Sequence, residues 1–533
     1  MKKGNLFRNK NKPFTEEWEL YEKGKEYNYS INLYETVNTN ERFFRGDQWD
    51  NLNAGGLPTP VFNIFKRIIG FFTSSIMQTP IKMRYNLTSP LGGNGFSEEE
   101  ASVASEKLNK IADLRWEKSK MNNLLASSLT DAAISGDGVC YTYWDSEIKT
   151  GQAFKGDFRS VLIDNTNVFF GNPNSKDVQK QPYILIAQRE TVIDLIAQAE
   201  KNGRSKEDID RIVPDDEKST QSGDRALIEM DGTKCISLIK LWKDENGKVL
   251  YRKSVKNAVI QDTTETGLSL YPIAFFNWTE IKNSWHGQAV GTGLIDNQIF
   301  INKGFAMVMK HMMDTAFSKV VYDSTVLDDW SDRVGEAIAV NGPVENVAKV
   351  LSPGVMQPGM LEVLSMAISN TKEFLGATDA ALGDVAPNNT SAILALQNTS
   401  AVPLENVKRN LYQFVEDIGL IWLDFMFTYY DDKRLVALSN NGKESYEAFS
   451  FSQYKNRLVD CKVDVGASSY WSEISSLNTL DALLKLGRIS TVQYLERLPE
   501  GLVTEKKKLI EELRAIEIAQ QQEEKELINV EKN

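Results

Sequence analysis

The longest regular pattern of apolar positions in this chain lies between Leu361 and Tyr430. It predicts a helix to about Leu375, a loop from Gly376 to Thr390, and then a second helix of about forty residues. Apolar side chains recur every three or four residues in the second helix and predict one buried stripe, formed by Val407, Leu411, Phe414, Ile418, Ile421, Trp422 and Phe425.

The second helix has a well-marked start and an internal proline. Asn389, Thr390 and Ser391 offer an N-cap, and Pro403 follows about twelve residues later, where we expect a kink. At about 1.5 Å per residue this helix would be about 60 Å long. Such a length is typical of an assembly, and a central core helix of a large α-rich protein is the alternative.

The loop before this helix consists of small and polar residues over positions 377–389. Such residues bury little area, so we expect the loop to be mobile. A mobile loop between two long helices is a candidate for contact with something that moves.

Elsewhere the pattern predicts an alternation of helices and strands. Helices are expected over 16–37, 63–77, 97–116, 118–134, 293–317, 475–486 and 491–498. Strands are expected over 139–144, 161–164, 168–170, 183–189, 235–242, 249–255, 271–278, 319–322, 337–340, 347–351 and 458–465. This order predicts an α+β fold that is mainly α.

Composition limits the classes of protein to consider. The chain has 533 residues, 41% hydrophobic and 25% charged, which is typical of a globular protein of two to four domains. Three cysteines, Cys140, Cys235 and Cys461, form no zinc or disulfide pattern and indicate a reducing compartment. The best apolar run, 64–76, is short and broken by charges, so we expect no membrane span and no export signal.

The net charge of −12 argues against a protein that binds nucleic acid tightly through phosphates. An acidic surface that DNA passes without sticking is compatible with this charge, and so is an acidic protein with no nucleic-acid role. The pattern 475–498 resembles a helix-turn-helix, with Gly487 at the turn, but its second helix has few basic side chains and carries Glu496.

Signals for catalysis are weak. Gly291 and Gly293 lack the third glycine of a dinucleotide loop, and no phosphate-binding loop motif occurs. His286 and His311 have no cysteine or histidine partner at metal spacing. The acids Asp328, Asp329 and Asp332 could hold Mg²⁺, as in nucleases, but a run of acids beside Trp330 in a loop is more often a solvated face or a subunit contact. We therefore expect no enzyme, no cofactor and no metal.

Several short motifs stand in an order that resembles tailed-bacteriophage portal proteins. The first is 44–49, Phe-Arg-Gly-Asp-Gln-Trp, followed by a proline-bearing loop, Asn63 at the start of an apolar helix, and a Thr79-Pro80 exit. The second is Gly136-Asp137-Gly138 between a helix and an aromatic strand. The third is a glycine-marked entry into a long helix with Leu294-Ile295-Asp296 and Asn302.

The resemblance covers roughly residues 40 to 515 and implies a wing, stem, clip and crown arrangement. The implied parts are an amino-terminal region and wing (1–285), a first stem helix (286–318), a clip (319–357), a second stem helix (358–376), a tunnel loop (377–390), a long kinked helix (391–430), wing return strands (431–470), a helical crown (471–515) and a flexible tail (516–533).

The resemblance also implies a function. A portal is a ring, usually of twelve copies, at one capsid vertex; it is assembled in the host cytoplasm and becomes part of the virion. Double-stranded DNA passes through the ring without sequence-specific binding during packaging and ejection. The implied partners are terminase, head-tail adaptor proteins, the major capsid protein and scaffold. The alternatives are a metal-dependent DNA-processing enzyme and a tail or adaptor protein that does not encircle DNA.

Two groups of candidate DNA-channel residues follow from the resemblance. In the tunnel loop they are Thr378, Asp379, Asp384, Asn388, Asn389 and Thr390, whose acids would repel phosphates while the amides make transient hydrogen bonds. On the first stem helix they are Lys303 and Lys310, seven residues apart and so on one face. A plain helix connection and ordinary solvent-facing lysines are the alternatives.

Overall fold

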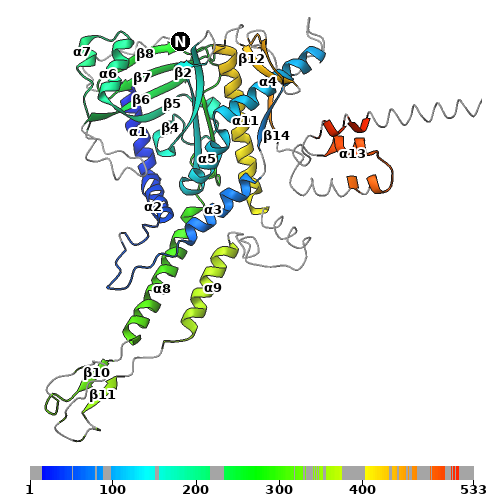
Figure 1. Ribbon diagram of the computed structural model, residues 1–533. Helices are drawn as coiled ribbons and strands as arrows, with labels where there is room; N and C mark the ends of the chain where they lie inside the picture. The colour runs from blue at the N-terminus through cyan, green and yellow to red at the C-terminus, as the bar shows by residue number, and fades with distance from the viewer. Residues whose placement is uncertain are drawn as a thin grey trace, which may run out of the picture. The chain divides into compact units, whose positions relative to one another are not determined.

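The computed structural model of the chain forms two compact units, one of residues 1–77 and 83–463 and one of residues 78–82 and 464–533. The structure describes residues 15–50, 52–78, 81–87, 98–150, 155–215, 233–316, 319–327, 347–351, 356–374, 402–430, 435–440, 443–451, 459–464 and 483–498, with shorter pieces among 331–345, at 454 and among 480–514. Within the described residues, the sheets and the long helices belong to the first unit (Figure 1).

The first unit begins with two helices, α1 (Glu16–Ser30) and α2 (Leu33–Arg45). The prediction of one helix over 16–37 is therefore wrong. Between the two helices, Asn32 has a φ of 53° and a ψ of 29°, in the left-handed region. Asparagine tolerates this conformation better than most residues, so the chain can turn here between two amphipathic segments.

The next three helices are α3 (Ile64–Met77), α4 (Glu98–Lys118) and α5 (Met121–Ser135), which confirm the predicted helices in number and order. The side-chain oxygen of Asn63 accepts a hydrogen bond from the backbone N–H of Lys66 at 2.9 Å. Asn63 is therefore an N-cap for α3, as its position in the sequence indicates.

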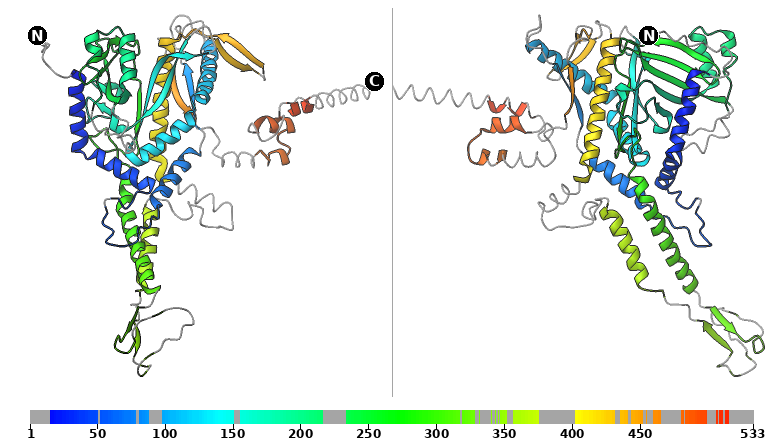
Figure 2. Two further views of the ribbon diagram at one scale, coloured as in Figure 1. Left: turned by 60° about the vertical axis from the view of Figure 1, so that its left-hand side comes forward. Right: turned by 180° about the vertical axis from the view of Figure 1, so that it is seen from behind.

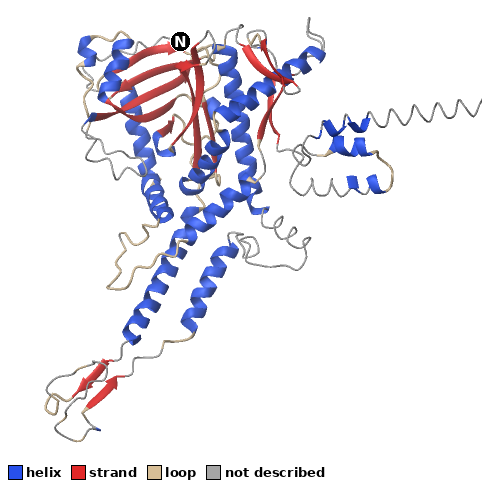
Figure 3. Cartoon of the chain, viewed as in Figure 1, coloured by secondary structure: helices blue, strands red, loops and turns tan. Residues whose placement is uncertain are grey.

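Two antiparallel sheets form the centre of the unit (Figure 3). The larger has the order β4 (Val168–Phe170), β5 (Ile184–Thr191), β6 (Lys234–Lys243), β7 (Val249–Val255) and β8 (Val259–Glu265). The smaller has the order β3 (Lys155–Ile163), β2 (Asp137–Lys149) and β9 (Ile273–Asn277).

Helices cover both faces of the larger sheet. Trp18 and Tyr21 of α1 pack against Phe169, Leu185 and Leu238. Leu195 of α6 (Val192–Lys201) packs against Val255 and Ile260, and the short α7 (Lys206–Ile209) follows it. Because Leu238 pairs with Ser254 in the β6–β7 register, Leu238 and Val255 point to opposite faces of the sheet.

The smaller sheet packs against α11 (Glu405–Tyr429). The rings of Phe414 and Phe276 lie 4.9 Å apart, and those of Trp422 and Phe158 lie 5.5 Å apart. The seven predicted stripe residues of this helix are all buried, which confirms the predicted buried face.

Pro403 does not lie inside this α-helix. It belongs to a 3-10 turn, Val402–Leu404, directly before α11 begins at Glu405. The expected kink stays a prediction, because the residues before this turn lie outside the described part of the chain. Proline lacks the N–H that an interior position needs, whereas the start of a helix leaves that N–H unused. Residues 391–401, where the helix was predicted to begin, lie outside the described residues.

A second helical pair extends the unit. A 3-10 turn (Gly291–Leu294) leads into α8 (Ile295–Ala316), and α9 (Gly359–Phe374) lies beside α8 in both views of Figure 2. Between them, β10 (Lys319–Tyr322) pairs antiparallel with β11 (Ala348–Leu351). Both strands were predicted; residues 337–339 of the further strand predicted between them lie outside the described residues.

The remaining strands are β12 (Leu435–Asn440) and β13 (Lys443–Ala448), which form a hairpin, and β14 (Val459–Asp464), which pairs with β1 (Lys82–Leu87). The second unit contains α13 (Thr491–Arg497), which begins with a capping box of Ser490 and Gln493. Gly487 before it has a φ of 66°, as the predicted turn requires.

Candidate functional site

Helix α8 buries one side and exposes the other. Its buried positions are Gln298, Ile301, Asn302, Gly304, Ala306 and Val308. Phe300 is 51% exposed, and Met312 and Met313 are each 61% exposed. An exposed phenylalanine and methionines on a helix indicate a surface that another surface covers.

Lys303 and Lys310 lie on the exposed side of α8. Seven residues correspond to a rotation of about 20° short of two full turns, so both lysines share one face. Lys303 is exposed, and Lys310 donates to the Asp314 carboxylate at 2.9 Å. The positive charge of Lys310 is therefore partly neutralised, whereas Lys303 has no ion pair within the described part of the chain.

Helix α9 is more exposed than α8. Of its described side chains only Leu364 and Thr371 are buried, while Leu361, Val363 and Met366 are between 45% and 63% exposed. Leu364 packs against Gly304 of α8 so closely that a β-carbon at position 304 would overlap the Leu364 side chain. A larger residue at position 304 would therefore displace the Leu364 side chain where α8 and α9 approach.

A polar cluster fixes α8 to the segment that precedes α3. The Asn302 side chain donates to Gln48 at 2.6 Å, and the Gln298 side chain donates to the Phe62 carbonyl at 2.7 Å. Gln298 also accepts from the Phe65 backbone N–H at 3.1 Å. These contacts join two motifs, 44–49 and the glycine-marked helix entry, that were recognised separately in the sequence.

A buried carboxylate organises the entry to α8. Asp137 accepts hydrogen bonds from the side chains of Asn165 at 2.8 Å and Asn277 at 2.7 Å, and from the Gly287 backbone N–H at 2.7 Å. The Nδ1 of His286 lies 2.7 Å from the same carboxylate. Sequence analysis missed this pairing, because 149 residues separate the two partners and no local spacing signals it.

The candidate tunnel-loop residues, from Thr378 to Thr390, lie outside the described residues, and so do Asp328, Asp329 and Asp332. Within the described residues, no group of three or more His, Cys, Asp or Glu side chains could hold a metal ion. No described helix is both long and apolar enough to cross a membrane.

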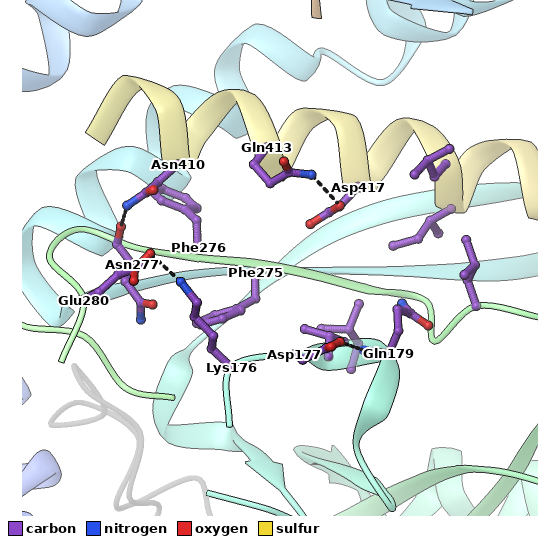
Figure 4. Close-up of a pocket in the computed structure, with 15 residues that line it drawn as sticks. Lys176, Asp177, Gln179, Phe275, Phe276, Asn277, Glu280, Asn410, Gln413 and Asp417 are labelled. Carbon is purple, nitrogen blue, oxygen red and sulfur yellow. Dashed lines mark hydrogen bonds and ion pairs between the residues drawn. The ribbon is translucent and has the colours of Figure 1, made fainter. Parts of the chain in front are cut away.

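A cavity of about 430 Å³ lies between α11, β9 and the loop at 176–179 (Figure 4). Asp417 on α11 faces it and accepts a hydrogen bond from the Gln413 side chain at 3.2 Å. The pKa of Asp417 is raised to about 6, chiefly by burial and also by the negative charges of Glu416 and Asp177, while the hydrogen bond from Gln413 acts in the opposite direction. Neither the cavity nor this shift was anticipated from the sequence.

A comparison with known protein families matches residues 25–469 to the phage P22-like portal protein family. A comparison with curated proteins gives no match. The family match includes α2 to α11, both central sheets and the strands β12 to β14. It thus contains the Gln48–Asn302 and Asp137–His286 contacts that hold α8 in place. Because the match extends over most of the 533 residues, the chain belongs to the phage P22-like portal protein family.

Proposed function

We propose that this protein assembles into a closed ring at one vertex of the phage capsid and forms the channel through which DNA is packaged and ejected. The observation that carries the proposal is the family match over residues 25–469. This family is structural rather than enzymatic, and its members are components of the phage particle.

The stem helices support the ring. Eight of the twenty large hydrophobic side chains that are exposed among the described residues lie on α8 and α9. They are Phe300, Met307, Met309, Met312, Met313, Leu361, Val363 and Met366. A closed cyclic arrangement of identical chains would cover these side chains without leaving open ends.

Electron microscopy of the purified protein tests the ring and its copy number, for which we propose twelve. A ring with a central hole of duplex width is expected, and it excludes both alternatives, a metal-dependent DNA-processing enzyme and an adaptor that does not encircle DNA. A species of 60.1 kDa at all micromolar concentrations in analytical ultracentrifugation would contradict the proposal.

Within this proposal, Lys303 and Lys310 line the channel and form two circles of positive charge in an otherwise acidic tunnel. The double variant Lys303→Ala/Lys310→Ala is expected to assemble and to change DNA packaging or retention. Asp314→Asn is the matched variant, because it frees Lys310 from its ion pair without removing a lysine. Unchanged packaging in the double variant would contradict the channel role.

The loop at 377–390 is proposed to surround the DNA at the narrowest part of the channel, with Asp379 and Asp384 repelling phosphates and Asn388 and Asn389 making transient contacts. Deleting 379–384 is expected to spare the ring and to shorten or release the packaged DNA. If the deletion instead dissolves the ring, while the few rings that form package normally, the loop is a structural connection.

The proposal assigns the remaining parts as follows: 1–285 is the amino-terminal region and wing, 319–357 the clip, and 471–515 the crown. Terminase, head-tail adaptor proteins, the major capsid protein and scaffold are the proposed partners. Co-sedimentation of the assembled ring with each candidate tests these contacts one at a time.

A further inference from the structure

The cavity beside α11 combines an apolar floor with an acidic opening. Its apolar lining includes Leu270, Phe275 and Leu420, each of which keeps part of its surface exposed. Its charged lining comprises three acids, Asp177, Glu280 and Asp417, and one lysine, Lys176. The lining therefore carries a net negative charge.

Asp417 is the acid in this cavity that lacks a cation. Lys176 pairs with Glu280 at 2.6 Å, and Lys180 pairs with Asp177 at 2.8 Å. For Asp417 the described residues supply one hydrogen bond, from Gln413, and no ion pair. A half-buried carboxylate next to other acids, with a raised pKa, is stabilised when a positive group approaches it.

The sequence contains a segment of complementary chemistry. Residues 1–14 carry five basic side chains and no acid, whereas the whole chain has a net charge of −12. The basic residues are Lys2, Lys3, Arg8, Lys10 and Lys12, and apolar side chains occur among them at Leu6, Phe7 and Phe14. Such a segment offers cations for the acidic opening and rings or aliphatic groups for the floor. These residues lie outside the described part of the chain.

The cavity lies within reach of this segment. Two hydrogen bonds hold Thr15 at the end of β7. Its backbone N–H donates to the Lys256 carbonyl at 3.0 Å, and its hydroxyl donates to the Val255 carbonyl at 3.1 Å. From there β7 extends for about 20 Å to Val249, at about 3.3 Å per residue. The Val249 N–H donates to Leu268 at 2.9 Å, two residues from Leu270 in the cavity lining. Twelve extended residues, from Thr15 back to Lys3, can span roughly 40 Å.

We propose that the basic segment of residues 1–14 docks into this cavity of the same chain, with a lysine or arginine against Asp417 and an apolar side chain on the floor. Docking covers the cleft between α11 and the loop at 176–179, and competing salt weakens it because the opening of the cavity is exposed to solvent.

Carbodiimide cross-linking of the full-length protein, read by mass spectrometry, tests the proposal. The reagent joins a lysine amine to a carboxylate that it contacts. Cross-links are expected from lysines of residues 2–12 to Glu280 or Asp177, in addition to the internal Lys176–Glu280 link, which serves as the positive control. About 0.5 M NaCl should reduce the first set, because surface charges are screened at that ionic strength.

Asp417→Asn sharpens the test, since it keeps the bond with Gln413 and removes the charge. The cross-links to Glu280 and Asp177 are expected to fall about fivefold, the effect of losing one partly exposed ion pair. Glu245→Gln, which removes an exposed acid outside the cavity, should leave them unchanged.

Three results would overturn the proposal. The first is the absence of cross-links from residues 2–12 while the Lys176–Glu280 link forms. The second is an equal yield of these cross-links in Asp417→Asn and the unchanged protein. The third comes from a mixture of ¹⁴N-labelled and ¹⁵N-labelled chains: cross-links that join one label to the other would show docking between chains rather than within one.

Discussion

The helices α11 and α9 differ in how far their apolar side chains are buried within a single chain. In α11 the chain buries eleven residues against its own sheets and helices, including Phe414 and Trp422. In α9 the described buried side chains are Leu364 and Thr371, and three large apolar side chains remain exposed. Similar apolar spacing in two helices thus leads to different packing.

This difference shows which part of the molecule buries its apolar side chains within a single chain. Burial of apolar surface is the main favourable term in folding, at roughly 25 cal/mol per Å². The region around α11 gains this energy within the chain. The helices α8 and α9 leave apolar side chains exposed within the chain, and in the proposed ring a neighbouring copy would bury them. Mutations in the two regions should therefore affect different observables.

The largest expected effect on chain stability comes from α11. Trp422 is fully buried, its ring contacts Phe158, and its indole N–H donates to the Ser160 hydroxyl at 2.9 Å. Trp422→Ala should lower the free energy of unfolding by about 4 kcal/mol, since it leaves a large cavity and removes the hydrogen bond to Ser160. Thermal unfolding measures the loss, and Trp422→Phe, which keeps a ring at this position, should lose much less. An equal loss in both variants would show that the cavity is not the cause.

A smaller loss is expected where α8 begins. Asp137→Ala removes the acceptor for the donors on Asn165, Asn277 and Gly287, all of them buried or partly buried. Leaving such donors unpaired should cost about 3 kcal/mol. The exposed pair of Asp113 with Arg84 provides the control, because Asp113→Ala should cost under about 1 kcal/mol. A comparable shift in both variants would contradict the importance assigned to the buried network.

The sequence predicted regular elements well and long-range contacts poorly. The buried stripe of α11, the Asn63 cap and the strands β10 and β11 each follow from a local pattern, and the structure confirms them. The α1–α2 break at Asn32 was missed because a left-handed asparagine leaves no periodic signal.

The structure tests fewer of the predictions for functional residues than of the predictions for helices and strands. Lys303 and Lys310 share an exposed face of α8, as their spacing predicts. That spacing does not reveal the ion pair of Lys310 with Asp314. The contacts of Gln48 with Asn302 and of Asp137 with His286 join residues more than 100 positions apart, which no local pattern reveals. The tunnel-loop residues stay a prediction, since they lie outside the described residues.

Asp417 should make stability near α11 depend on pH. Its pKa is raised from 3.8 to about 6 in the folded chain, where Asp177 and Glu416 are nearby acids and Lys176 and Glu280 also line the cavity. The protonated form is thus favoured by folding, so its contribution is greatest below about pH 4 and is lost as the pH rises through about 6. In about 0.5 M NaCl, which weakens the proposed docking of residues 1–14, the melting temperature of Asp417→Asn should rise relative to the unchanged protein over this range. A constant difference from pH 4 to 7 would contradict the raised pKa.

The smallest effect on chain stability is expected for exposed side chains of α8 and α9. It tests the comparison with the buried side chains of α11 most directly. Met312, Met313 and Met366 are each more than 60% exposed, so changing all three to glutamine removes little buried surface within the chain. The melting temperature of the unassembled chain should change by less than the equivalent of about 0.5 kcal/mol, as for ordinary surface substitutions. Assembly should nevertheless fail or weaken, because the same side chains would be buried between copies, where each contributes apolar area. Sedimentation velocity across a concentration series measures the shift toward monomer. The matched control is Ile193→Gln on α6, because Ile193 is 75% exposed and lies outside α8 and α9.

If the triple variant assembles as well as the control, the exposed side chains of α8 and α9 are ordinary surface and do not contribute to assembly. If it melts much earlier as a monomer, these side chains already have partners within the chain.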